Sequence, residues 1–139
     1  MRILIVGAMG LVGRRVLLQR LTLGDQITVM TRDRRRTRQL LVALGLTGID
    51  IIEGDPAVPG PWQESVTGHD VVITLAGAGI ADRRWSSRYI RTMRDSRVDG
   101  TYQLVQAIER SADRPALLLS ASAVGYYGDR GSVLTDEHA

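Results

Sequence analysis

Three glycines at intervals of three residues, Gly7, Gly10 and Gly13, form a pattern suited to binding a phosphate group. They stand between the apolar run 3–6, which is typical of a buried strand, and a stretch with helical spacing of apolar residues. The first glycine permits a tight turn, the second lets the backbone approach phosphate oxygens, and the third lets the helix pack closely on the strand. We interpret the loop as the site of a dinucleotide pyrophosphate rather than as an ordinary glycine-rich turn. The predicted contact residues of this loop are Gly7, Met9, Gly10, Leu11, Val12 and Gly13.

The residue type after the second expected strand bears on which dinucleotide binds. An acidic residue there accepts hydrogen bonds from the adenosine ribose of NAD, whereas this chain has Thr31 and Arg32, with Asp33 one place later. A guanidinium group binds a 2′-phosphate through charge-assisted, often bidentate hydrogen bonds. The sequence therefore favours NADP over NAD, with Thr31 and Arg32 as contacts. The basic residues that follow either strengthen this preference or form the solvated start of a helix; they are Arg34, Arg35, Arg36 and Arg38.

A further candidate is the carboxylate of Asp55, which follows Gly54 after the third expected strand. A carboxylate at this place can accept a hydrogen bond from the adenine amino group. The alternative is a turn aspartate that precedes Pro56. We retain Asp55 as a cofactor-binding candidate with both interpretations open.

Short apolar runs alternate with segments of helical periodicity, and these elements must position the candidate residues. The expected strands cover residues 2–6, 26–31, 49–53, 70–75 and 116–120. Helices are expected after residue 10, around residues 40–44, at 62–66 and over about 86–111. Gly100 lies inside the longest helix, which indicates close packing or a cofactor there. Residues 121–139 show no period.

This alternation predicts an α/β fold, specifically a Rossmann-like doubly wound parallel sheet. The expected strand order is 3-2-1-4-5, with right-handed crossovers and helices on both faces. A chain of 139 residues fits one domain of ordinary size. We therefore expect a single NAD(P)-binding domain over residues 1–139.

Composition narrows the function classes. The chain is 44% hydrophobic and 24% charged, the balance of a globular protein. It has no cysteine, and His69 and His138 lie far apart in the sequence, so we expect no metal site. No segment resembles a signal peptide or approaches the roughly 20 apolar residues of a membrane span. We expect a cytoplasmic location and no membrane partner.

The net charge of +3 and the pI near 9.9 raise the question of nucleic-acid binding, because clustered cations neutralise phosphates. The arginines of the long helix recur at three-residue steps, which rotate them around the helix rather than along one face. They are Arg88, Arg91, Arg94 and Arg97. Trp62 and Trp85 are separated and are better explained as partial core than as a stacking platform. We expect no nucleic-acid partner.

Together these motifs resemble the extended short-chain dehydrogenase/reductases, and most closely the atypical, NAD(P)-dependent epimerase-family branch called YfcH-like. The resemblance runs over essentially the whole chain. The segments that carry it are the glycine loop, Thr31-Arg32, Gly54-Asp55, 75–80, Arg83-Arg84-Trp85, Ser96-Arg97, Gly100-Thr101 and 120–128. The resemblance implies further cofactor contacts at Leu75, Ala76, Gly77, Arg97 and Ser120. It also implies that only the N-terminal half is present and that the substrate-binding part is absent.

The resemblance bears on catalysis as well. In the wider superfamily a serine or threonine after the fifth strand polarises a substrate carbonyl, and Ser122 matches it. The acid or base is the tyrosine of a later Tyr-x-x-x-Lys motif, but this chain contains no lysine, so that pair is impossible. Tyr126 and Tyr127 match the superfamily's Tyr-Gly turn, which implies that they line the substrate pocket.

The resulting prediction is the NADP(H)-binding domain of an oxidoreductase or nucleotide-sugar epimerase-like protein, inactive as this stretch alone. The cofactor is NADP (NADPH) by preference, with NAD as the other dinucleotide that fits. The resemblance implies hydride transfer near Ser122 and a small carbonyl compound or sugar nucleotide as substrate. The alternative is a non-catalytic module that senses NADP(H) or docks a partner, whose exposed apolar surface would favour homodimers.

Overall fold

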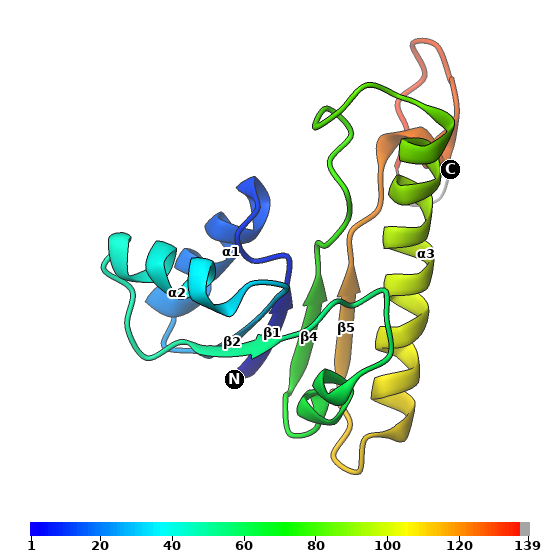
Figure 1. Ribbon diagram of the computed structural model, residues 1–139. Helices are drawn as coiled ribbons and strands as arrows, with labels where there is room; N and C mark the ends of the chain where they lie inside the picture. Colours follow the sequence, from blue (N-terminus) through cyan, green and yellow to red (C-terminus); the bar gives the residue numbers. More distant parts are fainter. Residues whose placement is uncertain (137–139) are drawn as a thin grey trace.

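The computed structural model describes residues 1–136, in which one parallel sheet is flanked by helices (Figure 1). The strands are β1 (Arg2–Val6), β2 (Gln26–Thr31), β3 (Asp50–Glu53), β4 (Val71–Thr74) and β5 (Leu117–Ser120). Their order in the sheet is β3-β2-β1-β4-β5, and the pairings are parallel. This confirms the predicted fold class and strand order.

Helices cover both faces of this sheet, as predicted. One face carries α1 (Leu11–Thr22) and α2 (Arg34–Ala43), and the other carries α3 (Ser87–Arg110) with the short 3₁₀ helix η1 (Pro61–Val66) (Figure 1). A second 3₁₀ helix, η2 (Val124–Tyr127), follows β5. The carboxyl ends of the strands therefore lie between the start of α1 and the start of α3.

β1 occupies the centre of the sheet because residues 3–6 are apolar on both faces, and each is at most 1% exposed. Such a strand needs a cover on either side. On one face its side chains pack with Leu17 of α1 and Leu41 of α2. On the other they pack with Leu104 of α3 and Trp62 of η1. The two cores fix the strand whose end carries the glycine loop.

The face under α1 and α2 is not covered as far as β5. Leu117 and Leu119 pair in register with Val71 and Ile73, two side chains of the core beneath α1. Leu117 and Leu119 are nevertheless each 47% exposed. Within residues 1–136, no helix lies over this part of the sheet.

Three expectations differ from the structure. The stretch after β5 contains η2, a helix too short to give a periodic signal. Trp62 is buried, but Trp85 is 61% exposed. Trp85 belongs to the exposed loop before α3, where its indole N–H donates to Ile80 O (2.8 Å). Gly100 is buried, yet a Cβ added there would lie 3.9 Å from Pro56 Cβ, so tight packing does not require this glycine.

Candidate functional site

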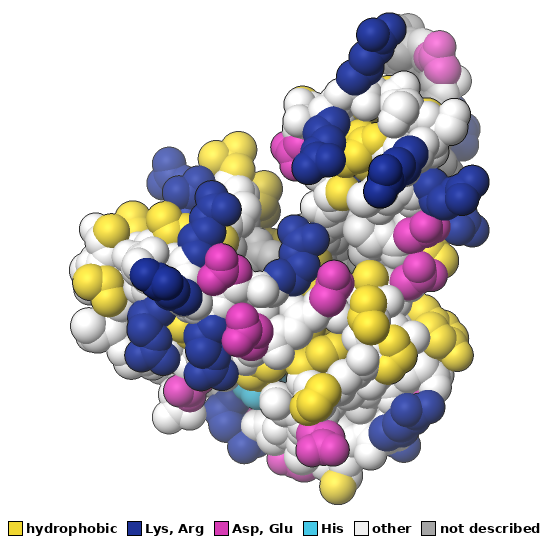
Figure 2. Space-filling view, viewed as in Figure 1, with side chains coloured by type: hydrophobic (Ala, Val, Ile, Leu, Met, Phe, Trp, Pro, Cys, Tyr) yellow, Lys and Arg dark blue, Asp and Glu magenta, His cyan; other side chains and the backbone are white. Residues whose placement is uncertain are grey.

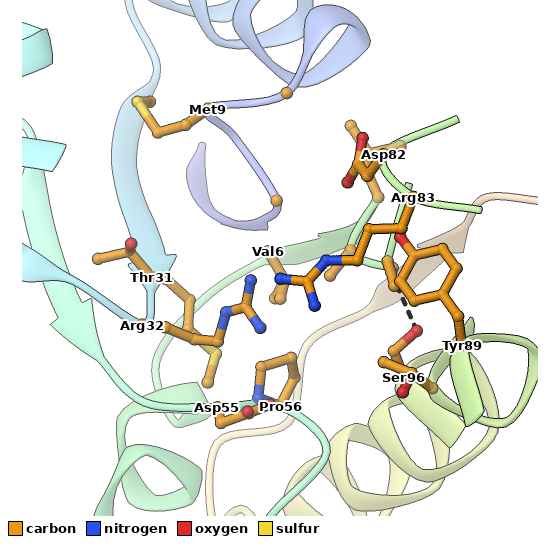
Figure 3. Close-up of a pocket in the computed structure, with 18 of the residues that line it drawn as sticks. Val6, Met9, Thr31, Arg32, Asp55, Pro56, Asp82, Arg83, Tyr89 and Ser96 are labelled. Carbon is orange, nitrogen blue, oxygen red and sulfur yellow. Dashed lines mark hydrogen bonds between the residues drawn. The ribbon is translucent and has the colours of Figure 1, made fainter. Parts of the chain in front are cut away.

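A cavity of about 740 Å³ opens at the carboxyl edge of the sheet, between the glycine loop, the β2–α2 turn and the start of α3. Its volume lies in the range of cofactor pockets, and open α/β sheets bind ligands at this edge. Many of the predicted contact residues line it, and Figure 3 shows several of them. The predicted residues in the lining are Gly7, Met9, Gly10, Thr31, Arg32, Asp55, Leu75, Ala76 and Gly77.

The glycine loop combines a left-handed turn with two close backbone approaches. Gly7 has a φ of +88°, and a Cβ on it would lie 2.8 Å from Ala76 N, so this position requires glycine. A Cβ on Gly13 would collide with Gly7 O and lie 2.8 Å from Ala8 Cα. The Gly10 N–H donates to Gly7 O (3.2 Å). The loop is therefore wrapped tightly under the start of α1.

The N-terminus of α1 faces this loop without a side-chain cap. Gly10 is the N-cap residue, and no acidic residue occupies the first turn. The first backbone N–H groups of the helix are thus available to an external acceptor, and the helix dipole adds a positive partial charge. The side chains of Leu11 and Val12 are 82% and 60% exposed and do not line the cavity, so these residues offer only backbone. This donor set fits a pyrophosphate.

Hydrogen bonds on both sides hold the turn that presents Arg32. Thr37 is 3% exposed, and its hydroxyl donates to Thr31 Oγ1 (2.9 Å), which also accepts from the Asp33 N–H (3.2 Å). The Asp33 carboxylate caps α2 by accepting from the Arg36 N–H (2.8 Å). With its two neighbours held, Arg32 points its guanidinium group into the cavity (Figure 3).

The other arginines of the basic segment do not join Arg32. The Arg34 guanidinium donates through Nη2 to Ile51 O (2.5 Å), and the Arg34 backbone N–H donates to the Glu53 carboxylate (3.2 Å). Arg34 therefore braces the end of β3. Within the described chain, Arg32 alone of the arginines at 32–38 belongs to the cavity lining. These contacts favour a helix start over a second set of phosphate ligands.

Asp55 makes a turn and also lines the cavity. Its Oδ1 accepts from the Ala57 N–H (3.0 Å), which is the turn aspartate expected before Pro56. Asp55 and Pro56 both belong to the lining, and they lie close to Arg32 in the view of Figure 3. The turn uses one carboxylate oxygen, so the two interpretations are compatible.

The loop between β4 and α3 forms the opposite wall, and Arg97 holds it in place. The Arg97 guanidinium donates through Nη1 to Ala78 O (3.1 Å) and to Met93 O (3.0 Å). A Cβ on Gly77 would lie 2.8 Å from Arg97 Cζ, so glycine lets the guanidinium group lie against the loop. Arg97, predicted as a cofactor contact, is thus placed behind residues of the lining and outside the lining itself.

The α3 side of the cavity contains residues that sequence reasoning did not select. Tyr89 OH donates to Gly79 O (2.6 Å), and Ser96 Oγ accepts from the Ala78 N–H (3.0 Å). The family segments 83–85 and 96–97 were the only sequence signal for these lining residues. No local sequence pattern predicts that the N-terminal part of α3 lies beside the strand ends. The unselected lining residues from the end of the loop and from α3 are Asp82, Arg83, Arg84, Ser86, Arg88, Tyr89, Thr92 and Ser96.

The residues predicted for catalysis and substrate contact are not in the cavity lining. Ser122 follows β5 and is exposed. Ser120, predicted as a cofactor contact, ends β5, is also exposed and is also outside the lining. Tyr126 is 83% exposed, and its ring meets that of Tyr127 edge to face, with centroids 5.5 Å apart. Ser122 and the tyrosines follow the carboxyl end of β5 and are outside the lining that contains the glycine loop, so their roles stay predictions.

Arginine predominates around the cavity. Its lining contains Arg32, Arg83, Arg84 and Arg88 against the two carboxylates of Asp55 and Asp82. Figure 2 shows dark-blue side chains on both sides of the hollow between the two lobes of the surface. An anionic ligand fits this surplus of positive charge.

Two carboxylates with lowered pKa values lie at the opposite, amino edge of the sheet. The N-terminal ammonium group, which is 2.8 Å from Asp25 Oδ1, holds the pKa of Asp25 below its ordinary value, with help from Arg20. The Arg2 backbone N–H, 2.7 Å from Asp70 Oδ2, does the same for the pKa of Asp70. These groups belong to the scaffold rather than to the cavity.

Residues 1–136 contain neither a cluster of metal ligands nor a helix that could span a membrane. In that part of the chain no three His, Asp or Glu side chains gather closely enough to hold a metal ion. His69 is occupied by Thr28 Oγ1 (2.9 Å) and Val66 O (3.3 Å), and His138 lies outside the described residues. None of the described helices has both the length and the apolar composition needed to cross a bilayer.

Comparison with known proteins places these features in a family. The model of the NAD dependent epimerase/dehydratase family matches residues 3–139. A chloroplastic epimerase family protein SDR39U1 homolog of Arabidopsis thaliana is 36% identical over 142 residues, covering 100% of this chain and 39% of the relative. An epimerase family protein of Staphylococcus epidermidis is 32% identical over 127 residues, covering 91% of this chain and 38% of the relative. The chain thus spans about two fifths of the length of these relatives.

Solved structures share the fold. Human epimerase family protein SDR39U1 with NADPH superposes with a TM-score of 0.69 at 23% identity, covering 91% of this chain and 38% of that one. UDP-glucose-4-epimerase from Stenotrophomonas maltophila, with bound NAD and formylated UDP-arabinopyranose, gives a TM-score of 0.80 at 18% identity, covering 100% of this chain and 42% of that one. At these identities the likeness concerns the fold alone.

Proposed function

The chain belongs to the NAD-dependent epimerase/dehydratase family, and we propose that residues 1–139 are the NADP(H)-binding half of an oxidoreductase or nucleotide-sugar epimerase-like protein. The observation that carries this proposal is the cavity at the carboxyl edge. It joins a glycine loop, an uncapped helix N-terminus and the guanidinium group of Arg32. Neighbouring folds with NADPH and with NAD support a nicotinamide dinucleotide.

In the proposed binding mode, each part of the dinucleotide is assigned to one part of the cavity. The pyrophosphate would lie on Gly7 and Gly10 at the start of α1, where backbone N–H groups and the helix dipole favour anions. The adenosine half would extend toward Arg32 and Asp55, and the nicotinamide half toward Gly77. When bound, the nicotinamide supplies hydride chemistry. The residues of this chain bind and orient the cofactor.

The β2–α2 turn favours NADP over NAD for two reasons. Arg32 points into the cavity and can pair with a 2′-phosphate. Asp33, the acidic residue next to it, caps α2 by accepting from the Arg36 N–H (2.8 Å) and does not belong to the cavity lining. The carboxylate that would select a free ribose hydroxyl is therefore outside the lining, whereas Arg32 is part of it.

A thermal-shift titration tests the proposal. We expect NADPH to raise the melting temperature more than NADH at equal concentration, because the ligand with the lower dissociation constant stabilises the folded state more. Arg32→Asp should reverse this preference. Arg35→Asp is the matched control, since it makes the same charge change on α2 outside the lining. If neither nucleotide shifts the melting temperature, the cofactor proposal is wrong.

We expect residues 1–139 to bind the cofactor without turning over a substrate. The chain contains no lysine, so a tyrosine acid or base here would lack the cation that lowers its pKa. Ser122 and the tyrosines of η2 are the residues that would face a substrate in a protein of the length of the relatives. Steady reduction of any carbonyl compound by residues 1–139 with NADPH would refute this expectation.

A second candidate function is a non-catalytic module that senses NADP(H) or docks a partner, for which a second copy of the chain is the partner that we propose. The exposed Leu117 and Leu119 on β5 favour this candidate, because an apolar sheet face of this kind calls for a cover. The two candidates agree on the cofactor and on the absence of turnover by residues 1–139. Only in the second candidate is association part of the function.

A further inference from the structure

We propose that Arg83 is a second selecting residue for the 2′-phosphate of NADP and acts opposite Arg32. The inference rests on the proposed function, since it concerns a ligand of the same cavity. The two arginines come from different walls. Arg32 belongs to the β2–α2 turn and Arg83 to the loop before α3.

The two guanidinium groups converge. In Figure 3 the side chain of Arg83 extends from its loop across the cavity, and its guanidinium group points toward that of Arg32, above Asp55 and Pro56. Arginine stays protonated at any ordinary pH, so these are two full positive charges. Like charges that face one another repel, and an anion between them turns that repulsion into attraction. The arrangement fits a group that carries about two negative charges, as a phosphate monoester does.

Asp55 lies nearby in Figure 3, but no carboxylate of the described residues forms a direct ion pair with either guanidinium group. No ion pair within residues 1–136 involves Arg32 or Arg83. The adjacent acid, Asp82, folds back on its own loop, where its Oδ2 accepts from the Gly79 N–H (3.2 Å). A Cβ on Gly79 would collide with the Asp82 carboxylate, so glycine permits this turn. Both guanidinium groups are therefore left for a ligand.

The loop that carries Arg83 is anchored before a ligand arrives. Tyr89 OH donates to Gly79 O (2.6 Å), and Ser96 Oγ accepts from the Ala78 N–H (3.0 Å). Beyond Arg83, the Ser86 N–H donates to Arg84 O (2.9 Å). On the other wall, Thr37 and Asp33 hold the turn of Arg32. Two side chains on anchored backbones lose less freedom on binding than two on free loops.

A 2′-phosphate and a pyrophosphate would use Arg83 differently. If Arg83 binds the 2′-phosphate, its loss weakens NADPH and leaves NADH unchanged, because a ribose hydroxyl offers no charge to the guanidinium group. If Arg83 binds the pyrophosphate, its loss weakens both dinucleotides equally. The pair 2′,5′-ADP and 5′-AMP makes the same distinction on the adenosine half alone.

The experiment measures dissociation constants of residues 1–139 for NADPH, NADH, 2′,5′-ADP and 5′-AMP by calorimetry. The variants are Arg83→Gln, Arg32→Gln, the double variant, and Arg91→Gln as a control on the exposed surface of α3 outside the lining. We expect Arg83→Gln to weaken NADPH and 2′,5′-ADP by about tenfold, the effect of one charge-assisted contact. NADH and 5′-AMP should change less than twofold, and Arg91→Gln should resemble the wild type.

The outcomes separate this inference from the proposed function. A wild type that binds neither dinucleotide overturns the proposed function. A wild type that prefers NADPH while Arg83→Gln behaves like Arg91→Gln keeps the function and overturns the role of Arg83. Equal losses of NADPH and NADH assign Arg83 to the pyrophosphate and also overturn it. Non-additive losses in the double variant would support one shared phosphate.

Discussion

At the scale of residues, side chains of the same type at nearby positions make different contacts. Arg32 and Arg34 are two places apart, yet one points into the cavity and the other donates to Ile51 O at the end of β3. Thr37 and Asp33 decide this, because their hydrogen bonds set the direction of the β2–α2 turn. The chemistry of the cavity therefore depends on polar groups that are not exposed to the ligand.

The lowered pKa of Asp70 predicts how the stability of the fold depends on pH. The Asp70 carboxylate accepts from the Arg2 N–H (2.7 Å) and from Arg2 Nη2 (3.2 Å), which lowers its pKa in the folded chain. The unfolded carboxylate has a pKa of about 3.9. Near this pH the folded state therefore binds fewer protons than the unfolded state. The stabilisation is complete above the unfolded pKa and is lost as the pH falls through the lower, folded pKa.

The test compares urea unfolding of the wild type and Asp70→Asn between pH 7 and pH 3. We expect the substitution to lower the free energy of unfolding at pH 7, with a difference that shrinks below about pH 4. Asp99→Asn, on the exposed surface of α3, is the control and should change little. A constant difference across the whole pH range would contradict the proposed linkage.

At the scale of elements, α3 does more than cover a face. Its C-terminal part packs on the sheet through Leu104 and Ala107, while its N-terminal part lies beyond the strand ends and supplies Tyr89, Thr92 and Ser96 to the cavity (Figure 1). The helix thereby connects the core to the loop that carries Arg83. Core packing and the position of that loop are consequently linked.

Gly100 of α3 gives a prediction for stability. An added Cβ would meet Pro56 at ordinary van der Waals distance, 3.9 Å, and the residue is inside a long helix. Gly100→Ala should therefore raise the free energy of unfolding by about 0.5–1 kcal/mol, the helix preference for alanine. Gly13→Ala is the contrasting variant, because its Cβ would collide with Gly7 O; it should destabilise the fold. Thermal unfolding measures both, and a destabilised Gly100→Ala would show that the helix cannot take a methyl group.

At the scale of the whole molecule, the sheet is covered unevenly. β1 has an apolar core on either face, whereas β5 leaves Leu117 and Leu119 each 47% exposed. The chain spans about two fifths of the length of its relatives. Burial of the apolar face of β5 against a partner surface would therefore stabilise the domain.

We expect residues 1–139 to associate in solution through this face. Sedimentation should show a dimer that weakens with dilution, because burial of leucine side chains drives the contact. Leu119→Asp should shift the equilibrium to monomer. Leu134→Asp makes the same change at a side chain that is 98% exposed and outside β5, and it should not shift the equilibrium. A monomer at all concentrations would reject self-association and the second candidate function with it.

The sequence by itself determined the strand order, the glycine loop, and the positions of Thr31, Arg32 and Asp55, because these depend on spacing and on turn chemistry within a few residues. Tertiary structure decided the rest. It separated Arg32 from Arg34, set Arg97 behind the β4–α3 loop, left Trp85 exposed, and brought Arg83 across the cavity toward Arg32. Residues about fifty positions apart lie close together here because the parallel strands end at one edge of the sheet and α3 lies beside that edge. Local sequence patterns cannot predict this proximity, because it depends on how distant elements pack.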